Sequence, residues 1–415
     1  MIAHPLSALD RDPAALAPPI REDDEAGDMD ALIDDIADGD VGRIDDTFDA
    51  DDIADGDVGL IDDFADGDVG FIDGIADDDV GRIDDIADDI GDGDIGGDVD
   101  ADADASGADP IWAQCRFLTC SVLPVRIACN LACPFCFSRS SVSALKAERR
   151  DWSDMDVEGY FAFSRARGAS RLVITGGGEP LLAPDVVLDL VRRARPFFDE
   201  IACFTNGSAL TPALAEALGR AGLSYLCYSR HAAEDDDATR LMGRGTPTLA
   251  RFFEAVEGLG GPKLKVRATC VMTRGAVDSR ATVWQYIEKL RAFGVEEFTF
   301  KHTYTAYPGS VFQGSGQDRW ARDHQIELDP FEDQGQIVGR LPWGPVVRRI
   351  EGVQVCHYRE PTPAWEKAHR IGRSLNLLSD GSVFASLEER QSLLYRLSGS
   401  STPSSAAAGS RASGP

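Results

Sequence analysis

The sequence predicts an α/β fold built on a parallel sheet, and three observations support this. Short apolar runs alternate about six times with segments of helical period. Parallel strands need crossover connections, which the helical segments supply. The acidic residues gather at one end of the chain, which leaves a near-neutral body long enough to bury one large core. An open barrel and a doubly wound sheet both fit this pattern.

The expected elements alternate through the body. Helices are placed where apolar residues recur at helical spacing, several of them behind a Ser, Thr or Asp cap. Strands are expected at 121–127, 171–175, 200–204, 224–228, 263–272 and 296–303, and helices at 154–165, 185–197, 211–221, 247–259 and 281–293.

The first 110 residues carry the net negative charge of the chain. They hold 38 acidic residues against 4 Arg and no Lys, whereas the remainder holds 33 acidic and 37 basic residues. A unit of about eleven residues, such as IDDFADGDVGF, repeats there with two or three aliphatic side chains in each copy. Such segments cannot bury enough apolar surface to offset chain entropy, so we expect a disordered acidic leader over 1–108. The Ser/Gly/Ala/Pro tail over 398–415 is expected to be disordered as well.

Calcium binding is the alternative interpretation of the leader, because its Asp-Gly-Asp clusters are similar to calcium loops. The D-x-D-x-D-G pattern followed by a Glu at the twelfth position is absent. We therefore expect a solvated acidic segment and keep a calcium buffer as the alternative.

The cysteine usage and the N-terminus indicate the compartment. Nine cysteines lie in the body at uneven spacing, and the N-terminus lacks the basic start and apolar core of an export signal. An odd number of cysteines in this context argues against a disulfide framework. No run of about 18 apolar residues occurs. We expect a cytoplasmic protein with reduced thiols, no membrane span and, given its negative charge, no nucleic-acid partner.

Three cysteines form one short motif, C-x3-C-x2-C, directly after the first expected strand: Cys129, Cys133 and Cys136. The carboxyl ends of parallel strands are where α/β folds place their chemistry. Thiolates are ligands for iron–sulfur clusters and for zinc. Three ligands leave one iron of a cluster free for a small molecule. Zinc would need a fourth ligand, for which Cys115 or Cys120 could serve, so both kinds of site stay open.

The motif, with Phe135 just before its third cysteine, resembles the signature of the radical S-adenosylmethionine (radical SAM) superfamily. The resemblance implies a partial (β/α)6 TIM-like barrel in which the three cysteines hold a [4Fe-4S] cluster. It also implies that S-adenosylmethionine binds the fourth iron and that Phe135 contacts the adenine. The implied activity is cleavage of S-adenosylmethionine to a 5′-deoxyadenosyl radical, which abstracts hydrogen from a substrate.

A second motif, Gly-Gly-Glu-Pro, ends the second expected strand at Gly177, Gly178, Glu179 and Pro180. Glycines let a backbone approach a ligand without a Cβ in the way. In the superfamily, this element contacts the methionyl amino group of S-adenosylmethionine. The resemblance therefore implies that these four residues bind the cofactor. The Thr-Asn-Gly sequence at 205–207 is also common in the superfamily, and a plain turn is its alternative.

Polar residues on the later strands complete the expected site. The resemblance implies that Ser229, at the end of the fourth strand, contacts the ribose and that Arg267, on the fifth, contacts the cofactor carboxylate. Lys301, His302 and Tyr304 end the last strand and are candidates for substrate contact or proton transfer. A solvated or salt-bridged surface role is the alternative for all five.

A hairpin is expected beyond the barrel, because Asp380-Gly381 joins two strand-like runs within 376–386. This hairpin is similar to the core of the accessory domain of many peptide-modifying radical SAM enzymes, where it ends in Cys. Here Ser386 takes that place, and Cys356 is the single cysteine of the extension. We therefore expect a small C-terminal α+β extension that caps the barrel without further clusters.

The expected organisation is a leader over 1–108, a radical SAM core barrel over 109–310, an extension over 311–397 and a tail over 398–415. The expected partners are a small-molecule or peptide substrate and an electron donor such as flavodoxin or ferredoxin. The alternative from another class is a non-catalytic zinc or iron–sulfur module whose acidic leader binds a partner.

Overall fold

The structure is a computed structural model that describes residues 108–126, 128–144, 150–257, 264–308, 310 and 312–397. The expected leader before residue 108 and the expected tail from residue 398 lie outside the described residues, so their disorder stays a prediction. Within the described ranges, no helix combines the length and the apolar character needed to cross a membrane.

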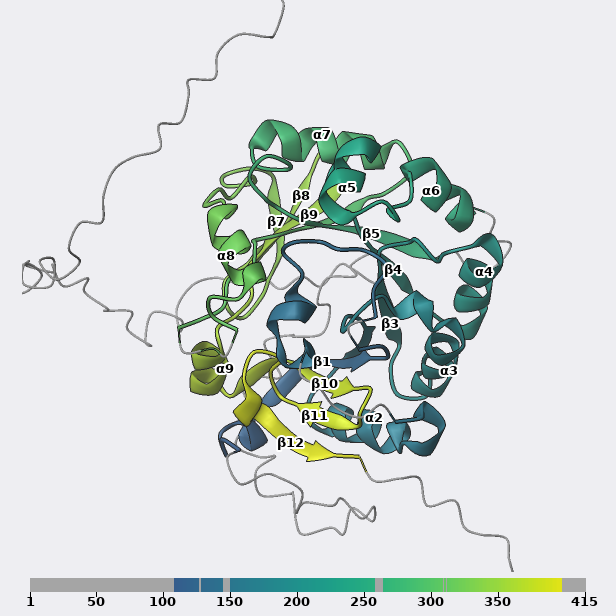
Figure 1. Cartoon of the computed structure of the whole chain (residues 1–415), viewed down its shortest axis with the longest axis vertical. Helices are drawn as coiled ribbons and strands as arrows, with labels where there is room; N and C mark the ends of the chain where they lie inside the picture. The colour runs from purple at the N-terminus through teal and green to yellow at the C-terminus, as the bar shows by residue number, and fades with distance from the viewer. Residues whose placement is uncertain are drawn as a thin grey trace, which may run out of the picture. The chain divides into compact units, whose positions relative to one another are not determined.

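One twelve-stranded sheet organises the described residues (Figure 1). Eight of its strands run parallel, in the order β10-β1-β2-β3-β4-β5-β6-β9. Antiparallel strands extend both edges, β11 and β12 beyond β10, and β8 and β7 beyond β9. The strands are β1 (Arg116–Leu123), β2 (Arg171–Ile174), β3 (Glu200–Thr205), β4 (Tyr225–Ser229), β5 (Lys265–Val271), β6 (Glu297–Lys301), β7 (Gln336–Arg340), β8 (Val346–Ile350), β9 (Val353–Tyr358), β10 (Ile371–Leu378), β11 (Ser382–Phe384) and β12 (Leu393–Arg396).

Helices connect the parallel strands and lie on the outside of the curved sheet, as Figure 1 shows for α3, α4, α6 and α7. Several begin at the caps that the sequence predicts. Asp156 accepts a hydrogen bond from the Gly159 amide, and Ser279 forms a capping box with Thr282. The helices are α2 (Val157–Ala166), α3 (Pro184–Ala194), α4 (Pro212–Ala221), α5 (Asp235–Met242), α6 (Leu249–Glu257), α7 (Arg280–Arg291), α8 (Gly316–Asp323) and α9 (Pro363–His369).

The predicted partial (β/α)6 barrel is confirmed, since β1 to β6 are parallel neighbours joined through helices. The first strand differs in its bounds from the expected 121–127. It begins at Arg116 and ends at Leu123, because Pro124 has no amide hydrogen to continue the ladder. Helix α5 lies where no helix is expected from the sequence, and its first turn is a run of three aspartates.

The main core lies where the helices pack on the sheet. Leu172 and Ile174 of β2 are fully buried there with Val187 and Leu190 of α3. The Tyr160 hydroxyl of α2 donates to the carbonyl oxygens of Ser121 and Leu375 at 2.8 Å, which ties β1 to β10. The opposite face of the parallel strands points into the barrel and is more polar.

The predicted hairpin at Asp380-Gly381 is confirmed, because β10 and β11 pair antiparallel with Leu377 opposite Val383. The extension also adds strands to the barrel sheet, which the sequence does not predict. It contributes β9, parallel to β6, and β10, parallel to β1, with α9 connecting them. The expected division at residue 310 stays a prediction, since strands from both sides of it share one sheet.

Candidate active site

The cysteine motif lies on the loop that leaves the carboxyl end of β1. Leu131 anchors this loop by packing with Met242 of α5 in a small apolar cluster, and the Ala132 amide donates to the Met242 carbonyl at 2.8 Å. Cys129 is exposed, and Cys133 and Cys136 are half-buried. The loop therefore presents its sulfur atoms at the mouth of the barrel.

The three thiols interact electrostatically. Burial raises the pKa of Cys129, and it raises the pKa of Cys133 to about 12. Cys136 and Cys129 raise the pKa of Cys133 further, so the three sulfurs lie near one another. Among the described residues, no three His, Cys, Asp or Glu side chains converge closely enough to hold one metal ion. Three thiolates on one short loop are a donor set that fits an iron–sulfur cluster, in which each thiolate binds a separate iron.

The two cysteines considered as a fourth zinc ligand lie elsewhere. Cys115 precedes β1 at the amino end of the barrel, and its Sγ contacts the Ile111 carbonyl oxygen at 3.5 Å. Cys120 is fully buried in the middle of β1, in the core on the helix side. Because β1 spans about 26 Å, Cys115 is far from the motif at its other end. Neither cysteine completes a zinc site with the motif.

The Gly-Gly-Glu-Pro turn follows β2 and packs directly on the cysteine loop. The Glu179 amide donates to the Ala128 carbonyl at 2.9 Å. A Cβ on Gly178 would lie 2.0 Å from the Ala128 carbonyl oxygen, and a Cβ on Gly177 would lie 2.1 Å from that of Val125. Gly177 also has φ +79°, a left-handed conformation that favours glycine. Both glycines are therefore required for the two motifs to touch.

Glu179 is buried and held by three donors. Its Oε1 accepts from the Leu181 amide at 3.0 Å and from the Thr205 hydroxyl at 2.7 Å. Its Oε2 accepts from the Asn206 amide at 2.7 Å. Burial raises the pKa of Glu179, and these hydrogen bonds oppose that effect. A carboxylate has about four acceptor positions, so one remains for a ligand amino group.

The Thr-Asn-Gly turn after β3 thus has a positioning role that its sequence alone left open. Besides holding Glu179, Asn206 places its Nδ2 at 3.8 Å from the Cys129 sulfur and at 3.2 Å from the Asn130 Oδ1. The turn connects the second motif to the first.

Phe135 turns inward from the cysteine loop and is buried. Its ring meets the His231 ring edge-on at 4.8 Å and lies 5.7 Å from the Trp320 ring of α8. The His231 Nδ1 accepts from the Val271 amide at 2.9 Å. Burial, with Lys301 and Arg230 nearby, lowers the pKa of His231 to about 3, so the ring is neutral with its proton on Nε2.

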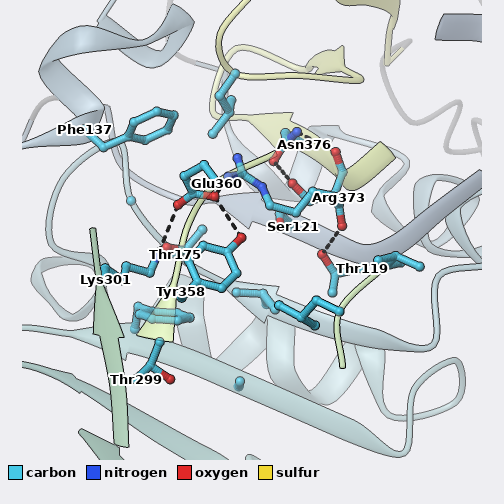
Figure 2. A pocket seen from close by; sticks show the side chains of 18 of the residues that line it. Thr119, Ser121, Phe137, Thr175, Thr299, Lys301, Tyr358, Glu360, Arg373 and Asn376 are labelled. Atoms are coloured by element: carbon cyan, nitrogen blue, oxygen red, sulfur yellow. Dashed lines mark hydrogen bonds and ion pairs between the residues drawn. The ribbon is translucent and has the colours of Figure 1, made fainter. Parts of the chain in front are cut away.

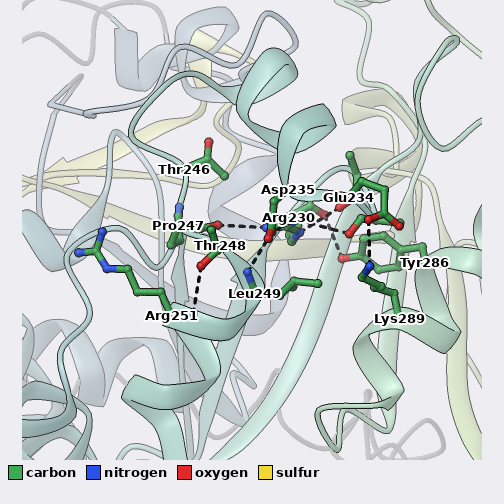
Figure 3. A network of polar contacts seen from close by, with 12 residues as sticks. Arg230, Glu234, Asp235, Thr246, Pro247, Thr248, Leu249, Arg251, Tyr286 and Lys289 are labelled. Atoms are coloured by element: carbon green, nitrogen blue, oxygen red, sulfur yellow. Dashed lines mark hydrogen bonds and ion pairs between the residues drawn. The ribbon is translucent and has the colours of Figure 1, made fainter.

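A fully buried arginine, Arg230, supports the backbone that carries His231 (Figure 3). The Arg230 guanidinium pairs with Asp235 at 2.7 Å and donates to the Pro247 carbonyl at 3.1 Å. Its own carbonyl accepts from the Tyr286 hydroxyl at 3.0 Å. These contacts join β4, α5 and α7, and they fix the backbone that carries His231.

Ser229 and Arg267 occupy different depths of the barrel. Ser229 ends β4 and lines the cavity near its mouth. Arg267 lies on β5 two residues before Thr269, the register partner of Ser229, so it is about 7 Å deeper, and its guanidinium pairs with Glu297 at 2.7 Å. The contact of Arg267 with the cofactor carboxylate stays a prediction, and its guanidinium is bound to the carboxylate of Glu297.

A cavity of about 1330 Å³ fills the barrel (Figure 2). Lys301 Nζ lies 3.2 Å from Glu360, whose carboxylate also pairs with Arg373 and accepts from the Tyr358 hydroxyl at 2.8 Å. Burial and the nearby Arg373 lower the pKa of Lys301 to about 8. Hydroxyl and amide side chains make up much of the remaining wall: Thr119, Ser121, Thr175, Thr299 and Asn376.

The candidates at the end of β6 all line this cavity. His302 lies 3.9 Å from Glu327, and burial lowers its pKa. The Tyr304 ring packs edge-on against Phe137 at 4.7 Å, and burial raises its pKa. Glu360, which pairs with Lys301, and Arg373, which also pairs with Glu360, come from the extension. Sequence reasoning missed both because nothing local shows that β9 and β10 return to the barrel.

Comparisons with known proteins agree with this geometry. A family model described as the Radical SAM superfamily matches residues 124–311. A probable GTP 3′,8-cyclase of Thermococcus kodakarensis is 26% identical over 160 residues, which are 39% of this chain and 49% of that protein. A PqqA peptide cyclase of Ruegeria pomeroyi is 34% identical over 115 residues, 28% of this chain and 29% of that protein.

Among solved structures, Streptococcus suis SuiB bound to S-adenosylmethionine matches with a TM-score of 0.43 and 14% identity, covering 68% of this chain and 63% of that chain. The chain spans about half the length of the curated relatives it matches. The family match includes both motifs and the strands β2 to β6. Residues 124–311 therefore form a radical SAM domain.

Proposed function

We propose that the chain is a radical SAM enzyme in which Cys129, Cys133 and Cys136 bind a [4Fe-4S] cluster. One observation carries the proposal. The cysteine loop and the Gly-Gly-Glu-Pro turn pack against each other at the carboxyl end of the parallel strands, through the Glu179 amide and the Ala128 carbonyl. When bound and reduced, the cluster supplies the electron that cleaves S-adenosylmethionine to a 5′-deoxyadenosyl radical.

The chain's own residues bind and orient the cofactor in this proposal. Gly177 and Gly178 let the backbone approach the methionyl group closely, and Glu179 offers its remaining acceptor position to the amino group, with Pro180 fixing the turn. Phe135 offers an aromatic face for the adenine. Its packing against His231 and Trp320 holds it in place without a hydrogen bond.

Ser229 is the proposed ribose contact, since it ends β4 at the mouth of the cavity. Arg267 is the proposed contact of the cofactor carboxylate, since it lines the same cavity as Ser229. Its pair with Glu297 neutralises two buried charges and links β5 to β6 below the site.

The proposed substrate is a small metabolite or a peptide segment with polar or anionic groups. Two cations, Lys301 and Arg373, share the carboxylate of Glu360 on the cavity wall, and Arg373 also interacts with the buried carboxyl of Glu388. His302 and Tyr304 add polar groups nearer the mouth. The names of the relatives include both a GTP cyclase and a peptide cyclase, so the substrate class is open between these two. A small reducing protein such as flavodoxin or ferredoxin is the proposed electron donor.

Anaerobic reconstitution with iron and sulfide, followed by reduction in the presence of S-adenosylmethionine, tests the proposal. We expect about four irons per chain and formation of 5′-deoxyadenosine. Cys133→Ala should abolish both. Cys270→Ala is the matched control, because Cys270 is a buried cysteine on the helix side of β5, outside the site. A colourless or zinc-loaded chain that forms no 5′-deoxyadenosine would instead indicate a non-catalytic metal-binding module.

A further inference from the structure

Cys129 is the cysteine of the motif that lies nearest to solvent. It is exposed, whereas Cys133 and Cys136 are half-buried. Asn130 beside it is exposed as well, and its Nδ2 donates to the Ser208 hydroxyl at 2.7 Å. Electron transfer slows steeply with distance, so a protein that reduces the proposed cluster must approach this part of the surface.

Two exposed arginines flank Asn130. Arg244 lies in the turn after α5, next to Gly245, where an added Cβ would lie 3.3 Å from the Asn130 carbonyl oxygen. Arg251, at the start of α6, donates to the Ser208 carbonyl at 3.4 Å (Figure 3). Both guanidinium groups are therefore carried by backbone that contacts the exposed end of the cysteine loop.

A third exposed arginine, Arg139, follows the motif directly. Its charge acts on the thiols of both Cys129 and Cys133, so it lies near the same loop. Within the part of the chain that the structure describes, no carboxylate forms an ion pair with Arg139, Arg244 or Arg251. We call these three residues the arginine patch.

Carboxylates are few on the two helices that carry the patch. Glu254 lies one turn beyond Arg251 on α6. The three aspartates that begin α5 lie at its far end, about 12 Å away along the helix. Two of them already pair with Arg230 and Arg240. The surface around Cys129 therefore presents more positive than negative charge.

We propose that the arginine patch is the docking surface for a small acidic protein that presents a reduced flavin, a proposal that rests on the cluster proposed above. Carboxylates around the flavin would face the arginines, and this complementarity would direct the flavin to Cys129. Complexes between redox proteins bury little surface, so long-range attraction contributes much of their rate of formation. That attraction weakens as salt increases.

Stopped-flow reduction of the reconstituted full chain by photoreduced flavodoxin, followed by the cluster absorbance, tests the proposal. The variant combines Arg244→Glu with Arg251→Glu and keeps Arg139, because Arg139 acts on the motif cysteines themselves. We expect the second-order rate constant to fall at least about tenfold at low salt. High salt should slow the native chain and bring the two rates together.

The matched control combines Arg192→Glu with Arg220→Glu, which changes the net charge equally at exposed positions on α3 and α4. It should keep the native rate with flavodoxin, and dithionite, a small reductant, should reduce all three chains alike. Equal flavodoxin rates in the variant and the native chain would overturn the proposal. An equal loss in the control, or a variant that dithionite also reduces slowly, would contradict a docking role for these arginines.

Binding of oxidised flavodoxin to the full chain without its cluster, measured by calorimetry at low salt, gives a second readout. It should weaken in the Arg244→Glu, Arg251→Glu variant and stay unchanged in the control. Because this measurement needs neither cluster nor S-adenosylmethionine, it separates the two proposals. A chain that binds flavodoxin through the patch but forms no cluster would refute the proposed function alone.

Discussion

Substituting Gly178 by Ala tests the contact between the two motifs most sharply. The new Cβ would lie 2.0 Å from the Ala128 carbonyl oxygen, 2.6 Å from its carbonyl carbon and 2.9 Å from its nitrogen. Non-bonded heavy atoms prefer about 3.5–4.0 Å, so the cysteine loop must move by more than 1 Å. All three atoms belong to the backbone, so no side-chain rotation relieves the clash.

Gly178→Ala is expected to lower both the stability of the chain and the rate of its reaction. Overpacking of this kind destabilises a protein by about 1–3 kcal/mol. A displacement of about 1 Å at reacting groups costs about a hundredfold in rate. We therefore expect Gly178→Ala to fold, to lose part of its iron and to form 5′-deoxyadenosine about a hundredfold more slowly. Chemical unfolding, iron analysis and a product assay on the same preparation measure the three effects.

Gly316→Ala is the matched control. Gly316 begins α8, has no heavy atom within 4 Å of an added Cβ and does not have a positive φ. Alanine in that helix should change the unfolding free energy by no more than about 1 kcal/mol, in the stabilising direction. If Gly178→Ala kept native iron content and turnover, the two motifs would not depend on each other and the reasoning would be refuted.

Two further predictions concern the groups around the turn. Thr205→Val removes the hydroxyl that donates to Glu179, so it should lower the unfolding free energy by about 1.5–3 kcal/mol; a loss below about 0.5 kcal/mol in urea unfolding would contradict this. His231 has a pKa of about 3 in the folded chain against an ordinary pKa of 6.5, so the unfolded chain binds more protons between these values. Stability should therefore fall as pH drops through this window, and His231→Gln should reduce the slope of unfolding free energy against pH; an unchanged slope would show that His231 titrates normally.

The alternation of strands and helices could be predicted because each element has its own apolar pattern or cap in the sequence. The caps at Asp156 and Ser279 and the apolar runs of β2 and β3 lie close to the expected places. The end of β1 was placed too late because Val125 continues the apolar run past Pro124, where the missing amide hydrogen stops the ladder. Local composition decided the type of element and the backbone chemistry decided its end.

The two motifs were also readable from the sequence, but their mutual contact was not. Their spacing predicts that both end neighbouring strands, whereas the role of Asn206 and Thr205 as donors to Glu179 depends on how three loops meet. The same holds for Glu360 and Arg373, which reach the cavity because β9 and β10 add to opposite edges of the barrel sheet. Pairing between strands so distant in sequence leaves no local pattern.

The central claim is that three thiolates hold one cluster with an iron open to S-adenosylmethionine. Electron paramagnetic resonance of the reduced, reconstituted chain, recorded with and without S-adenosylmethionine, tests it most directly. We expect a [4Fe-4S] signal that shifts on addition of the cofactor and that disappears in Cys129→Ala, Cys133→Ala and Cys136→Ala alike. A signal that stays the same with the cofactor, or that survives loss of any of these cysteines, would contradict the account.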